Sequence, residues 1–122
     1  MKRMLVVDDS TAIRKAIRRI LESLGYDVDE AENGRQALTY CIEWGHVDGI
    51  LLDIDMPVMD GLTFLRLLRQ DARFAELPVM MCTTHNAMSK IEEALSLGAN
   101  EYIMKPFDAE IIGSKLEQLG IA

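Results

Sequence analysis

The sequence has few cysteines, and their spacing does not suit a metal or redox centre. Only two cysteines, Cys41 and Cys82, occur among 122 residues, and both lie in apolar surroundings. Without a C-x-x-C pair, neither a structural zinc site nor a thioredoxin-type redox centre is indicated. We therefore expect both thiols to be free and buried in the core.

The sequence also lacks a long apolar run. The N-terminal stretch MKRMLVVDDS has a charged start, but its apolar part is too short for a signal peptide and far too short for a membrane span. No repeat, low-complexity stretch or linker interrupts the chain. These absences predict a single domain, residues 1–122, located in the reducing cytoplasm without a membrane partner.

Positive charge is scarce relative to negative charge. The chain has 13 Lys and Arg against 20 Asp and Glu, so its formal net charge is −7. A surface that binds the phosphate backbone of DNA needs an excess of basic residues, so DNA binding is not expected. With 49% hydrophobic and 27% charged residues, the composition is that of a globular protein, and its acidity suits one that holds a cation.

Short apolar runs alternate with helical patterns along the chain. The predicted strands cover residues 4–7, 27–31, 49–53, 78–83 and 101–104. The predicted helices cover residues 10–24, 35–44, 62–70, 87–97 and 108–119. The strand runs are continuously apolar, which is typical of strands buried on both faces. This alternation predicts an α/β fold with a doubly wound, five-stranded parallel sheet covered by five helices.

The first predicted helix combines an apolar face with basic residues. We expect Asp9 or Ser10 to cap its start and Gly25 to end it. The apolar residues at helical spacing are Ile13, Ile17, Ile20, Leu21 and Leu24. The basic residues are Arg14, Lys15, Arg18 and Arg19. Two interpretations of the basic residues stay open: a solvated helix face, or a site for an anionic partner such as a nucleotide or an acidic protein surface.

Polar residues follow the strands at the points where these end. Asp8 and Asp9 follow the first strand, Asp53 ends the third, Thr83 ends the fourth, and Lys105 follows the fifth. Because the carboxyl ends of parallel strands meet at one edge of the sheet, these side chains should converge there. Asp53 would thus be the last residue of the most hydrophobic strand and would face this edge rather than the core.

Three converging carboxylates repel one another unless a positive charge compensates them. Mg²⁺ suits this role because it prefers oxygen ligands and uses one or two carboxylates together with water. The hydroxyl of Thr83 and the ammonium group of Lys105 suit an oxyanion rather than a second metal ion. Together these groups indicate phosphoryl transfer with a carboxylate as the nucleophile.

Four motifs, in this order and spacing, resemble the receiver domain of two-component response regulators: LVVDDS, ILLDIDMPVMDG, VMMCTT and YIMKPF. The resemblance covers essentially the whole chain. It is strongest to CheY-like receivers that consist of a single domain, because the chain ends about where the fifth helix should end. It implies a flavodoxin-like fold and the function of a signalling switch.

The resemblance also implies a set of ligands and a phosphoacceptor. Asp53 would accept a phosphoryl group from the phosphohistidine of a histidine kinase. Asp9, Asp53 and the backbone carbonyl of Asp55 would bind Mg²⁺, and Asp8 would hold the ion through a water molecule. Self-catalysed phosphorylation and dephosphorylation would be the only chemistry, so the protein would not be an enzyme acting on an external substrate.

Further roles implied by the resemblance concern the phosphoryl oxygens and the response to them. Thr83 and Lys105 would contact these oxygens, and Tyr102 would turn inward as Thr83 moves toward them. Asp55, Thr84 and His85 occupy positions at which family members tune the lifetime of the phosphorylated state. For His85, a solvated loop histidine without such a role is the simpler alternative.

The output of such a switch would be a protein contact. Candidate targets are the flagellar motor switch, another chemotaxis component, or a phosphorelay protein. Two other hypotheses stay open. The segment Asp53-Ile54-Asp55 resembles the D-x-D motif of haloacid-dehalogenase-like phosphatases, although that motif belongs near the first strand. Alternatively, the protein would be an adaptor that keeps the fold without the chemistry.

Overall fold

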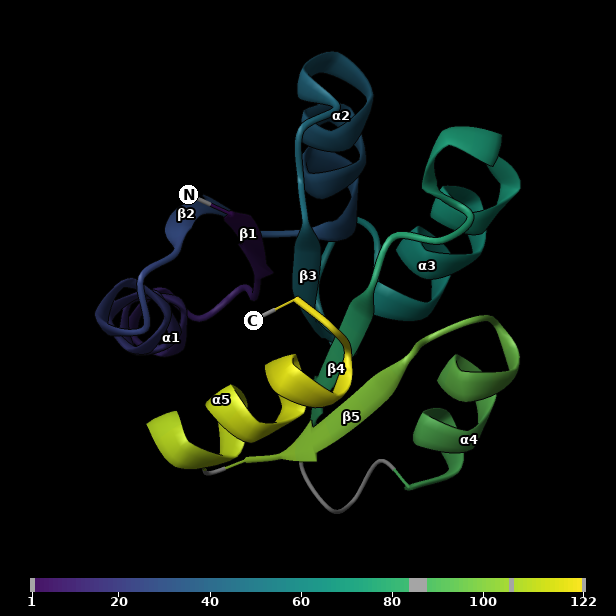
Figure 1. Ribbon diagram of the computed structural model, residues 1–122. Coiled ribbons are helices and arrows are strands. Elements are labelled where there is room, and N and C mark those ends of the chain that lie inside the picture. The colour runs from purple at the N-terminus through teal and green to yellow at the C-terminus, as the bar shows by residue number, and fades with distance from the viewer. Residues whose placement is uncertain (1, 84–87, 106, 122) are drawn as a thin grey trace.

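The computed structural model in Figure 1 describes residues 2–83, 88–105 and 107–121 of the chain. Strands and helices alternate throughout. Their order is β1 (Arg3–Val7), α1 (Thr11–Ser23), β2 (Asp27–Ala31), α2 (Gly34–Trp44), β3 (Gly49–Asp53), α3 (Gly61–Gln70), η1 (Ala72–Phe74), β4 (Val79–Thr83), α4 (Met88–Ser96), β5 (Glu101–Met104) and α5 (Ala109–Gln118). Every predicted strand and helix is present. The short 3₁₀ turn η1 was not predicted, because three residues are too few to show a period.

The five strands form one parallel sheet in the order β2-β1-β3-β4-β5, which confirms the predicted fold class. The chain passes from β1 to β2 on one side and then crosses to β3 on the other side of β1. The order therefore reverses between β1 and β3. In open α/β sheets, ligands bind at such a reversal, beyond the carboxyl ends of the strands.

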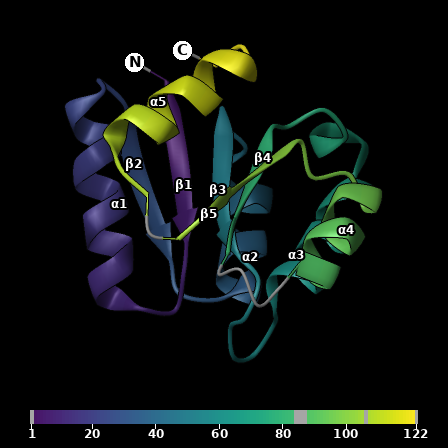
Figure 2. The same ribbon diagram turned by 90° about the horizontal axis from the view of Figure 1, so that it is seen from below.

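Helices cover both faces of the sheet. Helices α1 and α5 lie on one face, and α2, α3 and α4 lie on the other (Figures 1 and 2). The core is divided in the same way, because alternate residues of each strand point to opposite faces. Met4 and Val6 of β1 belong to the cluster under α1 and α5, whereas Leu5 and Val7 belong to the cluster under the other three helices.

Side-chain caps start four of the helices. The side chains of Ser10, Asn33, Asp60 and Asp108 each accept a hydrogen bond from a backbone N–H in the first turn of α1, α2, α3 and α5, respectively. Such caps satisfy donors that have no partner inside the helix. Of the two caps expected as alternatives for α1, Ser10 is therefore the one used. Asp108 was predicted correctly.

The apolar face of α1 is only partly covered. Ile17 and Leu21 are buried, whereas Ile13 and Leu24 are exposed. Leu24 lies close to Gly113 of α5, which has no side chain to cover it; a Cβ there would lie 3.9 Å from Leu24 Cδ2. The expected apolar face is thus wider than the surface that packs on it.

Two expectations from the composition can be compared with the structure. Cys41 and Cys82 are both free and buried, as predicted. Across the parts of the chain that the structure describes, no helix has the length and apolar character needed to cross a membrane.

Candidate functional site

The parallel register places two carboxylates side by side. Val7 of β1 lies opposite Leu52 of β3, so the next residues, Asp8 and Asp53, reach the carboxyl edge at the same level. Asp9 follows immediately. One carboxylate oxygen from each of Asp8, Asp9 and Asp53 lies within 4.8 Å of the others. The structure therefore brings together the three carboxylates that the sequence predicted to converge.

Lys105 reaches these carboxylates from the end of β5. Its Nζ donates to Asp8 Oδ2 at 2.9 Å and to Asp53 Oδ1 at 3.4 Å. Its backbone N–H donates to the carbonyl oxygen of Thr83 at 2.7 Å. Because β4 separates β5 from β3, the long lysine side chain spans the end of β4. This is the convergence expected from the sequence.

Thr83 completes the described part of this edge. It is buried at the end of β4, and the β3–β4 register pairs Asp53 with Cys82, so Thr83 lies one residue further along than Asp53. Thr84 and His85, which follow Thr83 in the chain, lie outside the described residues. Their expected influence on the lifetime of a phosphorylated state therefore stays a prediction.

The site carries more negative than positive charge. Burial raises the pKa of Asp53 to about 6, and the nearby charge of Asp8 adds to this effect, while Lys105 opposes it. Burial by itself would lower the pKa of Lys105, but its hydrogen bond to Asp8 and the charge of Asp53 outweigh burial and raise it. One ammonium group thus stays charged but does not compensate the carboxylates fully, and a second cation would be stabilised here.

The loop after β3 approaches Asp53 closely. The N–H of Gly61, the first residue of α3, donates to the carbonyl oxygen of Ile54 at 2.8 Å. A Cβ at Gly61 would lie only 2.1 Å from the backbone oxygen of Asp53. The start of α3 can therefore pack against the backbone of Asp53 only because residue 61 has no side chain.

The same loop contains a tight turn. Val58 has φ of +70°, and the N–H of Met59 donates to the carbonyl of Pro57 at 2.8 Å, a three-residue turn of the strained type. The carbonyl of Met59 then accepts the N–H of Gly34 at 2.9 Å. This hydrogen bond connects the loop after β3 to the first residue of α2.

The family model described as response regulator receiver domain matches residues 4–117. The chain belongs to this family. It is 39% identical over 122 residues to the chemotaxis protein CheY1 of Helicobacter pylori, which covers 94% of each chain. It is 36% identical over 118 residues to the chemotaxis protein CheY homolog of Campylobacter jejuni, covering 96% of this chain and 91% of that relative.

Solved structures agree with this assignment. The chemotaxis protein CheY4 of Vibrio cholerae superposes on this receiver domain with a TM-score of 0.90, at 34% identity and 98% coverage of both chains. A CheY-like receiver domain protein from Methanospirillum hungatei superposes with a TM-score of 0.88 at 32% identity, covering 98% of this chain and 94% of that one. This receiver domain is accordingly a phosphorylation-dependent switch of two-component signalling.

The side chain of Asp55 is not part of the carboxylate group formed by Asp8, Asp9 and Asp53. Its side chain is 72% exposed and accepts a hydrogen bond from Lys90 Nζ at 2.8 Å. Lys90 lies in the first turn of α4, so this pair links the β3–α3 loop to α4. Sequence reasoning missed Lys90, because 35 residues separate the partners and no spacing rule applies over that distance.

The basic residues of α1 are mostly engaged within the receiver domain itself. Arg14, Lys15 and Arg18 all donate to the carboxylate of Glu30 in β2, whereas Arg19 is exposed. Burial of Glu30 would raise its pKa, but the three hydrogen bonds outweigh burial and lower the pKa to about 2. Three of the four basic residues thus bind a carboxylate of the same chain. An anionic partner for this helix face stays a prediction.

Tyr102 lies at the centre of β5, where it pairs with Met81 of β4. Its side chain is partly buried against the core under α2, α3 and α4. On the surface it lines a shallow hollow together with Ile111 and Lys115 of α5. The structure thus places Tyr102 beside the middle of β4 and next to α5, and its role as a switch stays a prediction.

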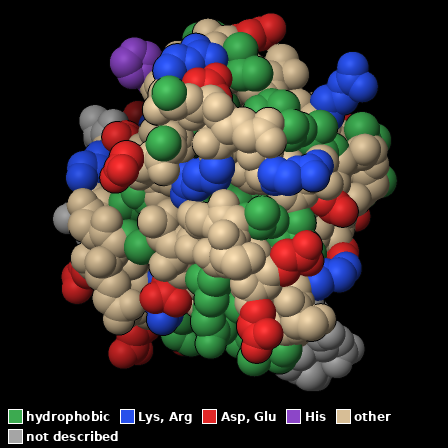
Figure 3. Space-filling model, turned by 90° about the vertical axis from the view of Figure 1, so that its right-hand side faces the viewer, with side chains coloured by type: hydrophobic (Ala, Val, Ile, Leu, Met, Phe, Trp, Pro, Cys, Tyr) green, Lys and Arg blue, Asp and Glu red, His purple; other side chains and the backbone are tan. Residues whose placement is uncertain are grey.

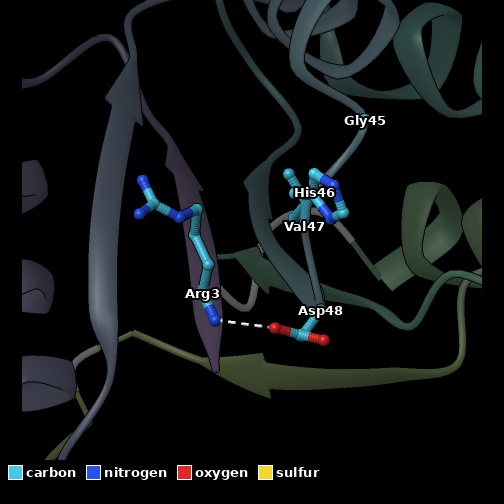
Figure 4. A pocket seen from close by; sticks show the side chains of 5 residues that line it. All are labelled: Arg3, Gly45, His46, Val47 and Asp48. Carbon is cyan, nitrogen blue, oxygen red and sulfur yellow. Dashed lines mark hydrogen bonds between the residues drawn. The ribbon is translucent and has the colours of Figure 1, made fainter. Parts of the chain in front are cut away.

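A second hollow lies at the opposite, amino-terminal edge of the sheet (Figure 4). It is lined by Arg3, Val47, His46 and Asp48, and the N–H of Arg3 donates to Asp48 Oδ2 at 2.7 Å. The guanidinium group of Arg3 points away from His46 (Figure 4). Because the hollow lies at the far end of the strands, it does not belong to the carboxylate site.

The surface over α3 and α4 carries mixed charges. Figure 3 shows basic and acidic side chains interspersed with hydrophobic groups on this face. A surface that binds DNA instead needs basic residues gathered on one face. The described part of this face accordingly agrees with the low basic content of the sequence.

Proposed function

We propose that residues 1–122 form a cytoplasmic receiver domain in which Asp53 accepts a phosphoryl group from the phosphohistidine of a histidine kinase, in a Mg²⁺-dependent reaction. The observation that supports this proposal best is the position of Lys105 Nζ, 3.4 Å from Asp53 Oδ1 and beside the carboxylates of Asp8 and Asp9. The ammonium group of Lys105 thus lies beside the proposed nucleophile, Asp53, where it could bind an incoming oxyanion.

The donor set suits Mg²⁺, because it consists of carboxylate oxygens in a site with uncompensated negative charge. Asp9, Asp53 and the backbone carbonyl of Asp55 would hold the ion, and Asp8 would act through a water molecule. When bound, Mg²⁺ would supply neutralisation of charge on the phosphoryl oxygens. Asp8 is also the partner that orients Lys105, at 2.9 Å.

The chain's own residues supply the nucleophile and two donors. With a pKa of about 6, the Asp53 carboxylate is ionised at neutral pH and can attack phosphorus. The bond from phosphorus to the histidine nitrogen breaks as the bond to the Asp53 oxygen forms, and the imidazole leaves. Lys105 and the hydroxyl of Thr83 would donate to the phosphoryl oxygens, which carry the charge of the transition state.

Signalling would follow from the charge added at Asp53. Lys105 and Thr83 would shift toward the phosphoryl group, and Tyr102 would turn inward as Thr83 moves. The altered surface would then bind a protein target better in one state than in the other. Because the relatives named above are chemotaxis proteins, a flagellar motor switch or another chemotaxis component is our first choice of target, and a phosphorelay protein our second.

Phosphorylation can be tested by weighing the intact protein after treatment with acetyl phosphate and Mg²⁺. We expect the wild-type protein to gain the mass of one phosphoryl group, and Asp53→Asn or the wild-type protein in EDTA to gain none. An undiminished gain in Asp53→Asn would refute Asp53 as the acceptor. Hydrolysis of p-nitrophenyl phosphate well above the Asp53→Asn control would instead favour a phosphatase.

Target binding can be tested by a pull-down with beryllofluoride, which mimics the phosphoryl group. We expect the wild-type protein, but not Asp53→Asn, to retain a partner only when beryllofluoride and Mg²⁺ are both present. Equal retention with and without beryllofluoride would favour an adaptor that does not depend on phosphorylation.

A further inference from the structure

Arg14 contacts the backbone of the site rather than its carboxylates. Its Nη1 donates to the carbonyl oxygen of Asp8 at 2.7 Å. This carbonyl belongs to the peptide group that joins Asp8 to Asp9. Because a peptide group is planar, a hydrogen bond to its oxygen also orients its N–H, which is that of Asp9.

Asp8 and Asp9 differ in how they are held. The backbone N–H of Asp8 donates to Ala31 at 3.1 Å, and its carboxylate accepts from the N–H of Ser10 at 2.9 Å and from Lys105. The carboxylate of Asp9 is exposed and accepts no hydrogen bond from any residue that the structure describes. No hydrogen bond from these residues fixes the Asp9 carboxylate, so the orientation of its backbone matters for where the side chain points.

Arg14 is itself held in place. Its Nε donates to Glu30 Oε1 at 3.0 Å, and the side chains of both residues are only 11% exposed. Lys15 and Arg18 hold the other oxygen of Glu30, at 2.8 and 2.7 Å. The guanidinium group is thus oriented by a carboxylate in β2 before it meets the Asp8 carbonyl, so the contact requires little additional ordering.

We propose that Arg14 is a positioning residue that fixes the Asp8–Asp9 peptide group and thereby directs the Asp9 carboxylate toward the Mg²⁺ site. Glu30 orients Arg14, so β2 contributes to the site although none of its side chains lies in it. The inference rests on the Mg²⁺ site proposed above and extends that site to a residue that touches neither ion nor phosphoryl group.

Positioning and simple electrostatics predict opposite results for the removal of Arg14. A positive charge near the site repels Mg²⁺, so removing it should by itself strengthen binding of the ion. Loss of positioning should instead weaken binding, because the Asp9 carboxylate would no longer be directed. The sign of the change therefore separates the two explanations.

The experiment measures Mg²⁺ dissociation constants of Arg14→Gln and Arg18→Gln by isothermal titration calorimetry. Arg18 is a matched control, because it also binds Glu30 but has no contact with the Asp8 carbonyl. We expect Mg²⁺ to bind about tenfold more weakly to Arg14→Gln, the range found when groups that orient metal ligands are removed. Arg18→Gln should bind Mg²⁺ as well as the wild-type protein or better.

A second readout needs neither Mg²⁺ nor activity. In Mg²⁺-free protein, the amide ¹⁵N and ¹H resonances of Asp9 should move in Arg14→Gln and stay in place in Arg18→Gln, because only the former loses the hydrogen bond to that peptide group. Arg14→Lys keeps the charge but has a single donor nitrogen. It should restore the fold if the glutamine variant is unstable, while leaving Mg²⁺ binding weakened.

The outcomes separate this inference from the proposed function. If the wild-type protein does not bind Mg²⁺, the proposed function is wrong and the inference is wrong with it. If the wild-type protein binds Mg²⁺ and Arg14→Gln binds it equally well or more tightly, the inference alone is wrong. Equal weakening in Arg14→Gln and Arg18→Gln would also overturn it, because the effect would then belong to the Glu30 cluster as a whole.

Discussion

The ammonium nitrogen of Lys105 lies 3.4 Å from Asp53 Oδ1, although 52 residues separate the two in the sequence. The lysine shares its charge between Asp53 and Asp8, and burial still raises the pKa of Asp53 to about 6. The carboxylates at the carboxyl edge of the sheet therefore repel one another. Binding of a cation would reduce this repulsion, and so would a neutral residue in place of Asp53.

The first prediction concerns Asp53→Asn in the absence of Mg²⁺. A folded-state pKa of about 6, above the ordinary value of 3.8, means that stability falls as the pH rises from about 4 to about 6. Asparagine does not ionise, so the stability of the variant does not fall in this way. We expect its free energy of unfolding, measured by urea denaturation, to exceed that of the wild-type protein by about 1–3 kcal/mol at pH 7.5.

The same comparison contains two controls. The difference between Asp53→Asn and the wild-type protein should disappear near pH 4, and millimolar Mg²⁺ should reduce it at pH 7.5 by stabilising only the wild-type protein. Asp55→Asn removes an exposed carboxylate from the same loop and should change stability little. A destabilised Asp53→Asn at pH 7.5 would show that the charge at position 53 is not unfavourable.

The second prediction concerns the close approach at Gly61. Alanine there would place a Cβ 2.1 Å from the backbone oxygen of Asp53, so the start of α3 or Asp53 must move. We expect Gly61→Ala to lower the free energy of unfolding by about 1–3 kcal/mol or more and to slow phosphorylation by acetyl phosphate. Thermal unfolding and intact mass against time would measure the two effects.

A matched glycine provides the control for this substitution. Gly113 lies inside α5, where a Cβ would meet only Leu24, at 3.9 Å. Gly113→Ala should raise stability by about 0.5–1 kcal/mol, because alanine favours helix, and should leave phosphorylation unchanged. If both alanine variants behaved alike, the contact at Gly61 would not be the cause.

The third prediction concerns the turn at Val58. A β-branched residue with φ of +70° is strained, and 77% of its surface is exposed, so little packing offsets the strain. Glycine adopts this conformation freely but adds entropy to the unfolded chain. We expect Val58→Gly to raise the free energy of unfolding, measured by urea denaturation, by about 1 kcal/mol, with an unchanged m-value. A loss of stability would mean that the valine is not strained.

The fourth prediction concerns the acid limb of the stability curve. Glu30 has a pKa of about 2 in the folded protein, below its ordinary value of 4.5. The stability that its ionised carboxylate contributes is therefore complete above pH 4.5 and is lost as the pH falls toward 2. Glu30→Gln should lower the free energy of unfolding by about 1–2 kcal/mol at pH 7, and the difference should vanish near pH 2.

Glu22 of α1 offers a comparison with Glu30 of β2. It pairs with Arg18 at 3.3 Å, but both side chains are more exposed than that of Glu30. Glu22→Gln should therefore change stability little at any pH. A loss as large as that of Glu30→Gln would mean that exposed pairs on α1 contribute as much as the cluster at Glu30.

Local features were predicted well because they depend on neighbouring residues. Asp108 was recognised as a helix cap, and Gly25 as a helix end, from preferences that act within one turn. Asp53 was recognised because it ends a continuous apolar strand. Ile13 and Leu24 belong to the apolar face expected for the first helix but are exposed, since a helical period does not show how much surface the neighbouring helices cover.

Contacts between distant segments were predicted only where several strand ends had to meet. The parallel sheet required Asp8, Asp53 and Lys105 to share one edge, and they do. No comparable constraint pointed to the contact of Arg14 with the Asp8 carbonyl or to the pair of Lys90 and Asp55. Such pairs depend on how far particular side chains reach, which sequence spacing does not record.

By itself, the sequence determined the order of strands and helices, the parallel sheet and the residues at its carboxyl edge. It could do so because hydrophobic period, caps and strand ends are set by interactions between near neighbours. Only the tertiary structure decided that Glu30 binds three of the four basic residues of α1 and that Arg14 holds the peptide group before Asp9. These contacts join segments brought together by packing, so their partners become known only when the distances between helix and sheet are known.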